Sequence, residues 1–228
     1  MRKILAIWLG KILTIVGKTV GKKSSSSPGA YALKICPDLV KGLEKCVSNG
    51  IIVTCGTNGK TTTNNLMASA LEAKGYKVIC NKLGANMLSG IATTVLQEMS
   101  IFGKLKADYA CLEIDEAYTP IVFDYVKPDV MVITNLFRDQ LDRYGEIDIT
   151  SDIIKRAIKK VPNLKLVLNG DDPLCVQFGR EENVKAYYYG ISEKVLPQLD
   201  DTKEGRFCPV CGEEQKYNYY HYSQLGDF

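Results

Sequence analysis

Several features that would assign a chain to a class at once are missing from this sequence. No apolar run is long enough to cross a bilayer, and no small-residue cleavage site follows the apolar N-terminus, so neither a membrane span nor a secretory signal is indicated. A net charge of +3 is too small to indicate nucleic-acid binding by itself. An Asn-Lys-x-Asp motif for reading guanine is also missing, which argues against a GTP-dependent switch.

The composition is that of an ordinary globular chain. Its 228 residues are 46% apolar and 24% charged, which allows one full α/β domain plus smaller pieces. Six of the eight cysteines are scattered singly, some of them in apolar strand patterns: Cys36, Cys46, Cys55, Cys80, Cys111 and Cys175. This spacing favours buried, reduced thiols over a disulfide framework and indicates the cytosol.

The most informative segment is a glycine-containing turn that we call the P-loop, Gly56–Thr61. It follows the apolar run 51–53 and precedes a helical pattern, and that order creates an anion site at a helix N-terminus. Lys60 is expected to reach the β- and γ-phosphates of a nucleotide, and the Thr61 hydroxyl to bind Mg²⁺. Thr54 replaces the first glycine of the general motif, whereas the narrower pattern G-T-x-G-K-T is intact. The predicted nucleotide-binding residues of this segment are Gly56, Thr57, Asn58, Gly59, Lys60, Thr61 and Thr62.

Strand and helix patterns alternate along the rest of the chain, which predicts a P-loop-containing α/β fold with a doubly wound, mostly parallel sheet. The predicted strands are 51–55, 77–80, 109–114, 129–134, 164–169 and 185–189. The predicted helices are 60–74, 88–100, 117–125, 149–160 and 173–180. The expected domains are an N-terminal helix and linker (1–29), an ATPase domain (30–200) and the start of a zinc-ribbon-like insertion (201–228).

The N-terminal segment is apolar with interspersed cations. Its apolar residues fall near helical spacing over residues 1–20, and Ser24–Gly29 is predicted to be a flexible linker. A basic helix that carries a tryptophan can lie on a membrane surface. The alternative is a helix that packs on its own protein or on a partner.

Polar clusters follow several predicted strands, and ligands of such sheets bind at the carboxyl ends of the strands. Glu113 ends one strand, and a carboxylate there beside the P-loop suits Mg²⁺. Asp115 and Glu116 are expected to cap the next helix instead. The two remaining clusters are 135–142 and 169–172. At the end of the second, Asp172 is predicted to be the N-cap of a helix that has Pro173 at its first position.

Together these segments resemble the central ATPase domain of the Mur ligase superfamily, which includes peptidoglycan amino-acid ligases and folylpolyglutamate synthases. The family motifs are G-T-x-G-K-T, a glutamate after a strand, T-N-x-x-x-D-H-x-D and N-x-D-D. They stand here in order at Gly56–Thr61, Glu113, Thr134–Asp142 and Asn169–Asp172. The resemblance implies that ATP phosphorylates a carboxylate and that an amine then attacks the acyl phosphate.

The resemblance also implies roles for single residues. Lys60 and Glu113 would be catalytic, with Glu113 holding Mg²⁺. Gln140 stands where the family has histidine, and its amide oxygen can still bind Mg²⁺. Asn169 and Asp172 would seat the nucleoside. Lys155 lies near the position of a carbamylated lysine in many members, although an exposed helical lysine is the commoner explanation.

Three departures narrow the resemblance to one branch: about 50 residues before the P-loop, Gln140 in place of histidine, and a late Cys-x-x-Cys pair. Members of that branch are synthetase subunits that amidate the α-carboxylate of D-glutamate in the lipid II stem peptide, giving D-isoglutamine for peptidoglycan. Ammonia would come from a GatD-like glutamine amidotransferase partner. Contact with the inner membrane surface would suit a lipid-linked substrate.

The pair Cys208 and Cys211 forms half of a zinc knuckle, because two thiolates at this spacing can bind one tetrahedral Zn²⁺. His221 is more simply a loop residue than a third ligand. The C-terminal domain of the family is not in these residues. We therefore expect a fragment that is inactive alone, with residues 200–228 poorly ordered.

Two other functions compete with amidation. A folylpolyglutamate synthase-like ligase would add glutamate to a folate, and Gln140 and the cysteine pair argue against it. A P-loop module without ligase activity would bind nucleotide only. An ammonia-versus-glutamate acceptor assay separates the two ligases, and a comparison of ATP with GTP tests the binding module.

Overall fold

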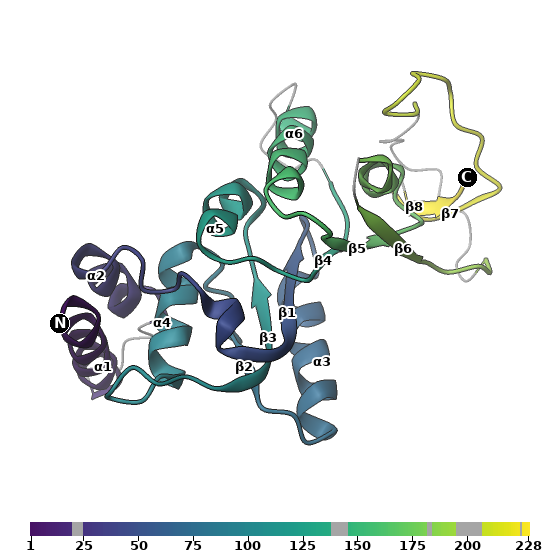
Figure 1. The fold of residues 1–228 in the computed structure, drawn as a ribbon. Coiled ribbons are helices and arrows are strands. Elements are labelled where there is room, and N and C mark those ends of the chain that lie inside the picture. Colours follow the sequence, from purple (N-terminus) through teal and green to yellow (C-terminus); the bar gives the residue numbers. More distant parts are fainter. Residues whose placement is uncertain (20–24, 138–145, 182–183, 195–206, 224) are drawn as a thin grey trace.

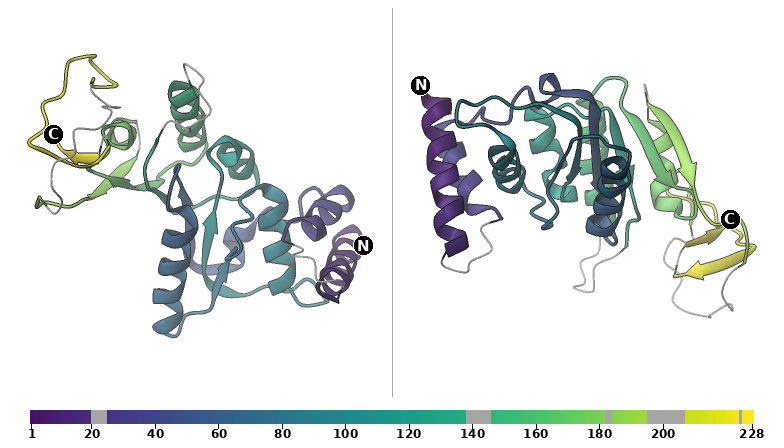
Figure 2. Two further views of the ribbon diagram at one scale, coloured as in Figure 1. Left: turned by 180° about the vertical axis from the view of Figure 1, so that it is seen from behind. Right: turned by 90° about the horizontal axis from the view of Figure 1, so that it is seen from below.

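The computed structural model describes residues 1–19, 25–137, 146–181, 184–194, 207–223 and 225–228. Two N-terminal helices, α1 (Arg2–Thr19) and α2 (Ser27–Ile35), pack against each other and against α4 (Leu88–Glu98). They form one end of the molecule in Figures 1 and 2. The 3-10 turn η1 (Leu43–Lys45) then leads into the sheet.

All strands of the main sheet are parallel, in the order β2-β3-β1-β4-β5-β6 (Figure 1). Their bounds are β1 (Val47–Cys55), β2 (Val78–Cys80), β3 (Ala107–Glu113), β4 (Val130–Ile133), β5 (Lys165–Asn169) and β6 (Lys185–Tyr189). The six strands predicted from the sequence are confirmed. β1 begins earlier than predicted, and its register with β3 shifts between Val47 and Gly50.

Helices connect the strands and cover both faces of the sheet. They are α3 (Lys60–Ala73), α4, α5 (Thr119–Tyr125) after the turn η2 (Glu116–Tyr118), α6 (Glu146–Lys159), and the short α7 (Pro173–Val176) with η3 (Gln177–Arg180). The chain moves from β1 to β2 in one direction along the sheet and in the other direction afterwards. Because such crossovers are right-handed, α3 covers one face and α4, α5 and α6 the other.

The core lies between the sheet and these helices. Its fully buried side chains include Ile51, Ile79, Leu112, Phe123 and Ile133. The inner strands are continuous apolar runs, as expected for strands that are covered on both faces. This packing fixes the ends of β1, β3, β4 and β5, so the segments that follow them meet at one edge of the sheet.

Two expectations about the chain ends are corrected. Helix α2 begins at Ser27 with Pro28 in its first turn, so the second half of the predicted linker is helical. Gly29 lies so close to α4 that its N–H donates to Thr93 Oγ1 at 2.9 Å. In the tail, strands β7 (Tyr219–Tyr222) and β8 (Leu225–Asp227) form an antiparallel hairpin where poor order was expected. The Gly226 N–H ties this hairpin to Asp171 O at 2.9 Å.

None of the helices in the described ranges combines the length and the apolar character needed to cross a membrane.

Candidate nucleotide-binding site

The P-loop connects β1 to the N-terminus of α3. Gly59 occupies the N-cap position in a left-handed conformation (φ 78°), and a Cβ added there would meet nothing within 4 Å. Gly59 has no side chain to accept hydrogen bonds from the first-turn N–H groups of α3. These groups and the positive end of the helix dipole are therefore available to bind an anion.

The segment after β4 holds the P-loop in shape. Asn135 binds Asn58 in both directions, accepting from its N–H at 2.9 Å and donating to its carbonyl oxygen at 3.1 Å. The Thr57 N–H donates to Asn135 O at 2.8 Å, and Thr134 Oγ1 donates to Asn58 O at 2.8 Å. Gly56 (φ 123°) is required here, because a Cβ would collide with Thr134 Oγ1 and lie 2.8 Å from Asn135 O.

Lys60 is turned back onto the P-loop and pairs with Glu116. Its Nζ lies 3.2 Å from Glu116 Oε1 and also donates to the carbonyl oxygen of Thr57 at 3.2 Å. The same Glu116 oxygen accepts from the Gly56 N–H at 2.6 Å. Burial raises the pKa of the Glu116 carboxyl, and the neighbouring Lys60 ammonium holds that rise back.

Sequence reasoning missed this role of Glu116. Asp115 does cap η2, by accepting from the Ala117 N–H at 3.1 Å, as predicted. Glu116 was expected to do the same, but its side chain reaches the P-loop instead. The contact could have been suspected from the position of Glu116 just beyond the carboxyl end of β3, because β3 is the direct neighbour of β1 in the sheet.

Thr61 and Glu113 lie together beside Lys60, as the predicted magnesium site requires. Thr61 Oγ1 donates to Glu113 Oε2 at 2.7 Å, and Glu113 is only 2% exposed. A hydroxyl and a carboxylate next to a phosphate site are the oxygen donors that Mg²⁺ prefers. The residues present therefore fit the ion.

The segment between β2 and α4 orients Glu113 and was not anticipated. Asn81 forms two hydrogen bonds of 2.8 Å with the Glu113 backbone, one to its N–H and one to its carbonyl oxygen. Asn86 Nδ2 lies 3.4 Å from Glu113 Oε1. Gly84 lies so close that a Cβ there would be 3.4 Å from Thr61 Oγ1. The sequence of the segment, N-K-L-G-A-N-M, is that of an ordinary loop, so nothing in it predicted contacts with Glu113.

Asn169 and Asp172 lie at the same edge, after β5, with their side chains bonded internally. Asn169 Nδ2 donates to Thr134 O at 3.0 Å, and Asn169 Oδ1 accepts from the Asp171 N–H at 3.0 Å. Asp172 is fully buried, caps α7 as predicted and accepts from the Leu136 N–H at 2.8 Å. Their role in seating a nucleoside stays a prediction.

Two other predicted residues, Gln140 and Lys155, give no information about the geometry of the site. Gln140 lies outside the described residues. Lys155 lies on α6 and is partly exposed.

The predicted zinc residues lie far along the chain, in a tight turn that we call the cysteine turn (Phe207–Glu214). The Gly212 N–H donates to Cys208 O at 2.9 Å, and Gly212 is left-handed (φ 74°). Hydrogen bonds from the N–H groups of Cys211 and Val210 lower the pKa of the Cys208 thiol. Within the described residues, no group of three or more His, Cys, Asp or Glu side chains is placed to hold a metal.

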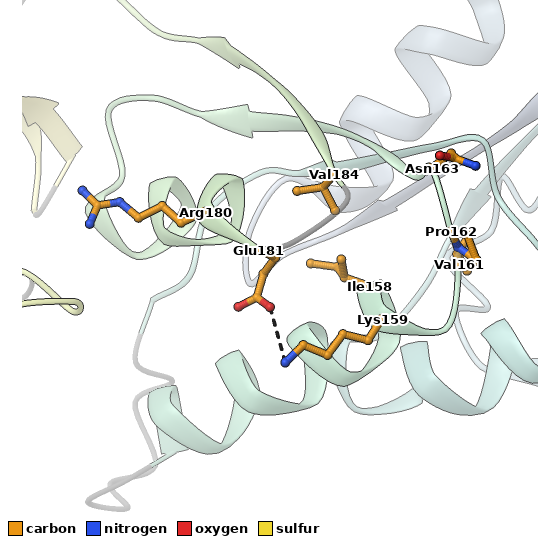
Figure 3. A pocket seen from close by; sticks show the side chains of 8 residues that line it. All are labelled: Ile158, Lys159, Val161, Pro162, Asn163, Arg180, Glu181 and Val184. Carbon is orange, nitrogen blue, oxygen red and sulfur yellow. Dashed lines mark ion pairs between the residues drawn. The ribbon is translucent and has the colours of Figure 1, made fainter.

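A cavity of about 550 Å³ lies elsewhere, between the end of α6 and η3 (Figure 3). Lys159 and Glu181 pair beside it at 3.5 Å, and Arg180 points away from both. Its lining residues Val161, Pro162 and Asn163 precede β5, so the cavity opens at the amino edge of the sheet. It is therefore separate from the P-loop edge, where the polar groups described above converge.

The sequence matches a family model described as Mur ligase middle domain over residues 53–228. It is 37% identical to the lipid II isoglutaminyl synthase (glutamine-hydrolyzing) subunit MurT of Staphylococcus aureus, over 100% of this chain and 51% of that protein. The subunit of the same name from Streptococcus pneumoniae is 36% identical, over 100% of this chain and 50% of that protein. The chain thus spans about half the length of the curated relatives it matches.

Solved structures share the fold. MurF from Acinetobacter baumannii aligns with a TM-score of 0.57 at 16% identity, over 72% of this chain and 35% of that one. MurF ligase from Thermotoga maritima in complex with ADP aligns with a TM-score of 0.55 at 19% identity, over 70% of this chain and 36% of that one. At such identities the likeness supports the architecture alone, and it agrees with the predicted α/β class.

Proposed function

The chain belongs to the Mur ligase family, and from this we propose that it carries the ATP-binding part of a carbon–nitrogen ligase that amidates a carboxylate. The proposed substrate is the D-glutamate α-carboxylate of the lipid II stem peptide, and the product is D-isoglutamine in peptidoglycan synthesis. The observation that carries the proposal is the grouping of Lys60, Thr61 and Glu113 at the N-terminus of α3. Identity to the MurT subunits over the whole chain supports the choice of substrate.

In the proposed reaction, an oxygen of the substrate carboxylate attacks the γ-phosphorus of ATP, and the bond to the β–γ bridging oxygen breaks to release ADP. The nitrogen of ammonia then attacks the carbonyl carbon of the acyl phosphate. The carbon–oxygen bond to phosphate breaks, phosphate leaves, and the nitrogen gives up a proton to give the amide.

This chain's residues would act on the first step. The P-loop and α3 N–H groups hold the phosphates, and Lys60 leaves Glu116 to meet the growing negative charge. Thr61 and Glu113 are the side chains that would hold Mg²⁺, which neutralises charge on the transferred phosphoryl group. Gln140 is proposed as a further oxygen ligand, and Asn169 and Asp172 as the nucleoside seat.

We also propose that ammonia comes from a GatD-like glutamine amidotransferase subunit, because the relatives are named as subunits of a glutamine-hydrolyzing synthase. The cysteines of the described chain are free thiols, which suits a cytoplasmic enzyme.

Cys208 and Cys211 are proposed as two ligands of a structural Zn²⁺. Support comes from the cysteine turn, whose N–H groups point at the Cys208 sulfur and so favour its thiolate form.

The proposed function is tested by reconstitution. The full-length protein is combined with a glutamine amidotransferase partner, ATP, Mg²⁺, glutamine and lipid II, and the stem peptide is analysed by mass spectrometry. We expect conversion of one carboxyl to an amide that requires ATP. If glutamate were added to the acceptor instead of ammonia, the folylpolyglutamate synthase-like alternative would hold. If nucleotide bound without turnover of any acceptor, the chain would be a binding module.

A further inference from the structure

Helix α1 has two different faces. One face packs on the protein and contains the buried residues Ala6, Ile7, Gly10 and Thr14. Gly10 allows a close approach to α4, because a Cβ there would lie 2.6 Å from Leu96 Cδ1. Lys11 Nζ donates to Gln97 O at 3.3 Å, which also ties α1 to α4. The orientation of α1 on the body is therefore fixed by its own contacts.

The opposite face is apolar and open to solvent. Its side chains are about half exposed or more: Met1, Leu5, Trp8, Ile12, Ile15 and Val16. Spacings of three and four residues from Met1 to Ile15, with Val16 beside Ile15, place them in one stripe along the helix. An apolar stripe of this kind is normally buried. Because α1 already packs on the protein through its other face, the exposed stripe is expected to bind something else.

The loop after α4 extends this surface. The Trp8 indole N–H donates to Ile101 O at 2.9 Å, so the loop lies against the stripe. Ile101 is 54% exposed and Phe102 is 71% exposed. The outer face of α1 with Ile101 and Phe102 is called the apolar end face below. It lies at the end of the molecule opposite the β7–β8 hairpin (Figure 2).

The charged residues of α1 itself are all cations. Arg2, Lys3, Lys11 and Lys18 belong to α1, and no aspartate or glutamate occurs in residues 1–19. A helix with an apolar stripe, flanking cations and an interfacial tryptophan suits the boundary between acyl chains and anionic headgroups. The helix is unsuited to crossing the bilayer.

We propose that the apolar end face docks on an anionic phospholipid surface, with α1 lying in the plane of the interface. The occupant follows from the charges, because anionic headgroups complement the cations that border the stripe. The proposal goes beyond the amidation reaction and needs neither ATP nor a partner. Its test is therefore independent of the proposed function.

Trp8 provides the first test, because it is the single tryptophan of the chain. If further tryptophans occur elsewhere in the full-length protein, they are replaced by phenylalanine. Vesicles of phosphatidylcholine with phosphatidylglycerol are added to this protein. We expect the Trp8 emission to move to shorter wavelength and to become protected from an aqueous quencher, with little change on phosphatidylcholine alone. A Trp8 that is already protected without vesicles would mean that protein covers the face, and would overturn the proposal.

Substitutions provide the second test. The double variant Ile12→Glu/Ile15→Glu should lower the fraction that sediments with anionic vesicles at least about tenfold, since two exposed apolar contacts are lost and two like charges are added. The matched control is Leu66→Glu on α3, which replaces a 69% exposed leucine far along the chain and should leave sedimentation unchanged. Circular dichroism checks that each variant is folded.

Two outcomes would contradict membrane docking. One is equal sedimentation of wild type and the double variant. The other is a wild-type protein that ignores anionic vesicles but self-associates in analytical ultracentrifugation, with the double variant monomeric. The second outcome would assign the face to another protein chain. Should the double variant unfold, the Trp8 measurement on wild type decides alone.

Discussion

The P-loop and the cysteine turn are both short turns that contain glycine, but they are held in different ways. The P-loop N–H groups donate to side chains that follow other strands, Asn135 after β4 and Glu116 after β3. The cysteine turn closes on itself: Cys208 N–H donates to Glu213 O at 2.8 Å, and Gly212 N–H returns to Cys208 O. These bonds tie the first turn to neighbouring strands and close the second turn within its own segment.

The thiols of the two regions differ accordingly. Cys55, at the end of β1 before the P-loop, is fully buried, and burial raises its pKa well above the usual value. The N–H groups of the cysteine turn lower the pKa of Cys208. A thiol in the core of the sheet is therefore inert packing, whereas the turn of N–H donors favours the thiolate that the proposed zinc site would need.

The largest expected effect is on the P-loop side. Lys60→Ala should reduce ATP turnover by at least about 10³-fold, because a charge aimed at the transferred phosphate is lost. Steady-state ATPase assays of the reconstituted protein measure this, with Lys82→Ala as control, since Lys82 pairs with Glu72 on the exposed surface. Near-normal turnover by Lys60→Ala would refute the assignment of the P-loop.

The next largest effect is on stability, and it is measured by replacing one glycine in each turn with alanine. Gly56→Ala should lower the free energy of unfolding by about 3 kcal/mol, because backbone strain adds to a collision with Thr134. Gly212→Ala should cost only about 1–2 kcal/mol, because only the left-handed conformation is strained and nothing lies within 4 Å of the new Cβ. Denaturant unfolding measures both changes. Equal losses would contradict the view that the fold holds only the P-loop.

A smaller, local effect is expected from the cysteine turn. Cys208→Ser should abolish zinc binding while changing the affinity for ATP less than about twofold, because the thiol lies outside the group formed by Lys60, Thr61 and Glu113. Zinc content by mass spectrometry and ATP affinity by calorimetry are the measurements, with Cys36→Ser as the matched control. A large loss of ATP affinity would show that the two regions are coupled.

The sequence predicted the parallel sheet well because its strands are buried on both faces. Their apolar runs, together with the glycine turn and the helix start at Asp172 and Pro173, are local signals. The proximity of Lys60, Thr61 and Glu113 could be predicted for the same reason: each lies at a strand end or helix start, and the parallel topology brings such ends together.

The contacts of Glu116, Asn81 and Asn86 were not predictable in the same way. Each depends on how a loop turns after a strand, which no local pattern specifies. At Ser27 a local pattern was misleading. The serine run predicted a linker, but the residues from Ser27 onward form α2, which is stabilised by packing on α4.

The smallest predicted effect concerns the pair that sequence reasoning missed. When ATP draws Lys60 away from Glu116, the carboxyl loses the cation that holds its pKa down and gains a nearby phosphate, so its pKa rises further. The complex then binds more protons than the free protein, and ATP affinity should increase as the pH falls through the range in which Glu116 titrates.

Calorimetry in two buffers of different ionisation enthalpy should detect uptake of a fraction of a proton when ATP binds. The protonation of ATP itself cancels when wild type is compared with Glu116→Gln, which should lose this uptake, whereas Glu72→Gln should keep it. An uptake that persists in Glu116→Gln would mean that Lys60 does not leave Glu116 when the nucleotide binds.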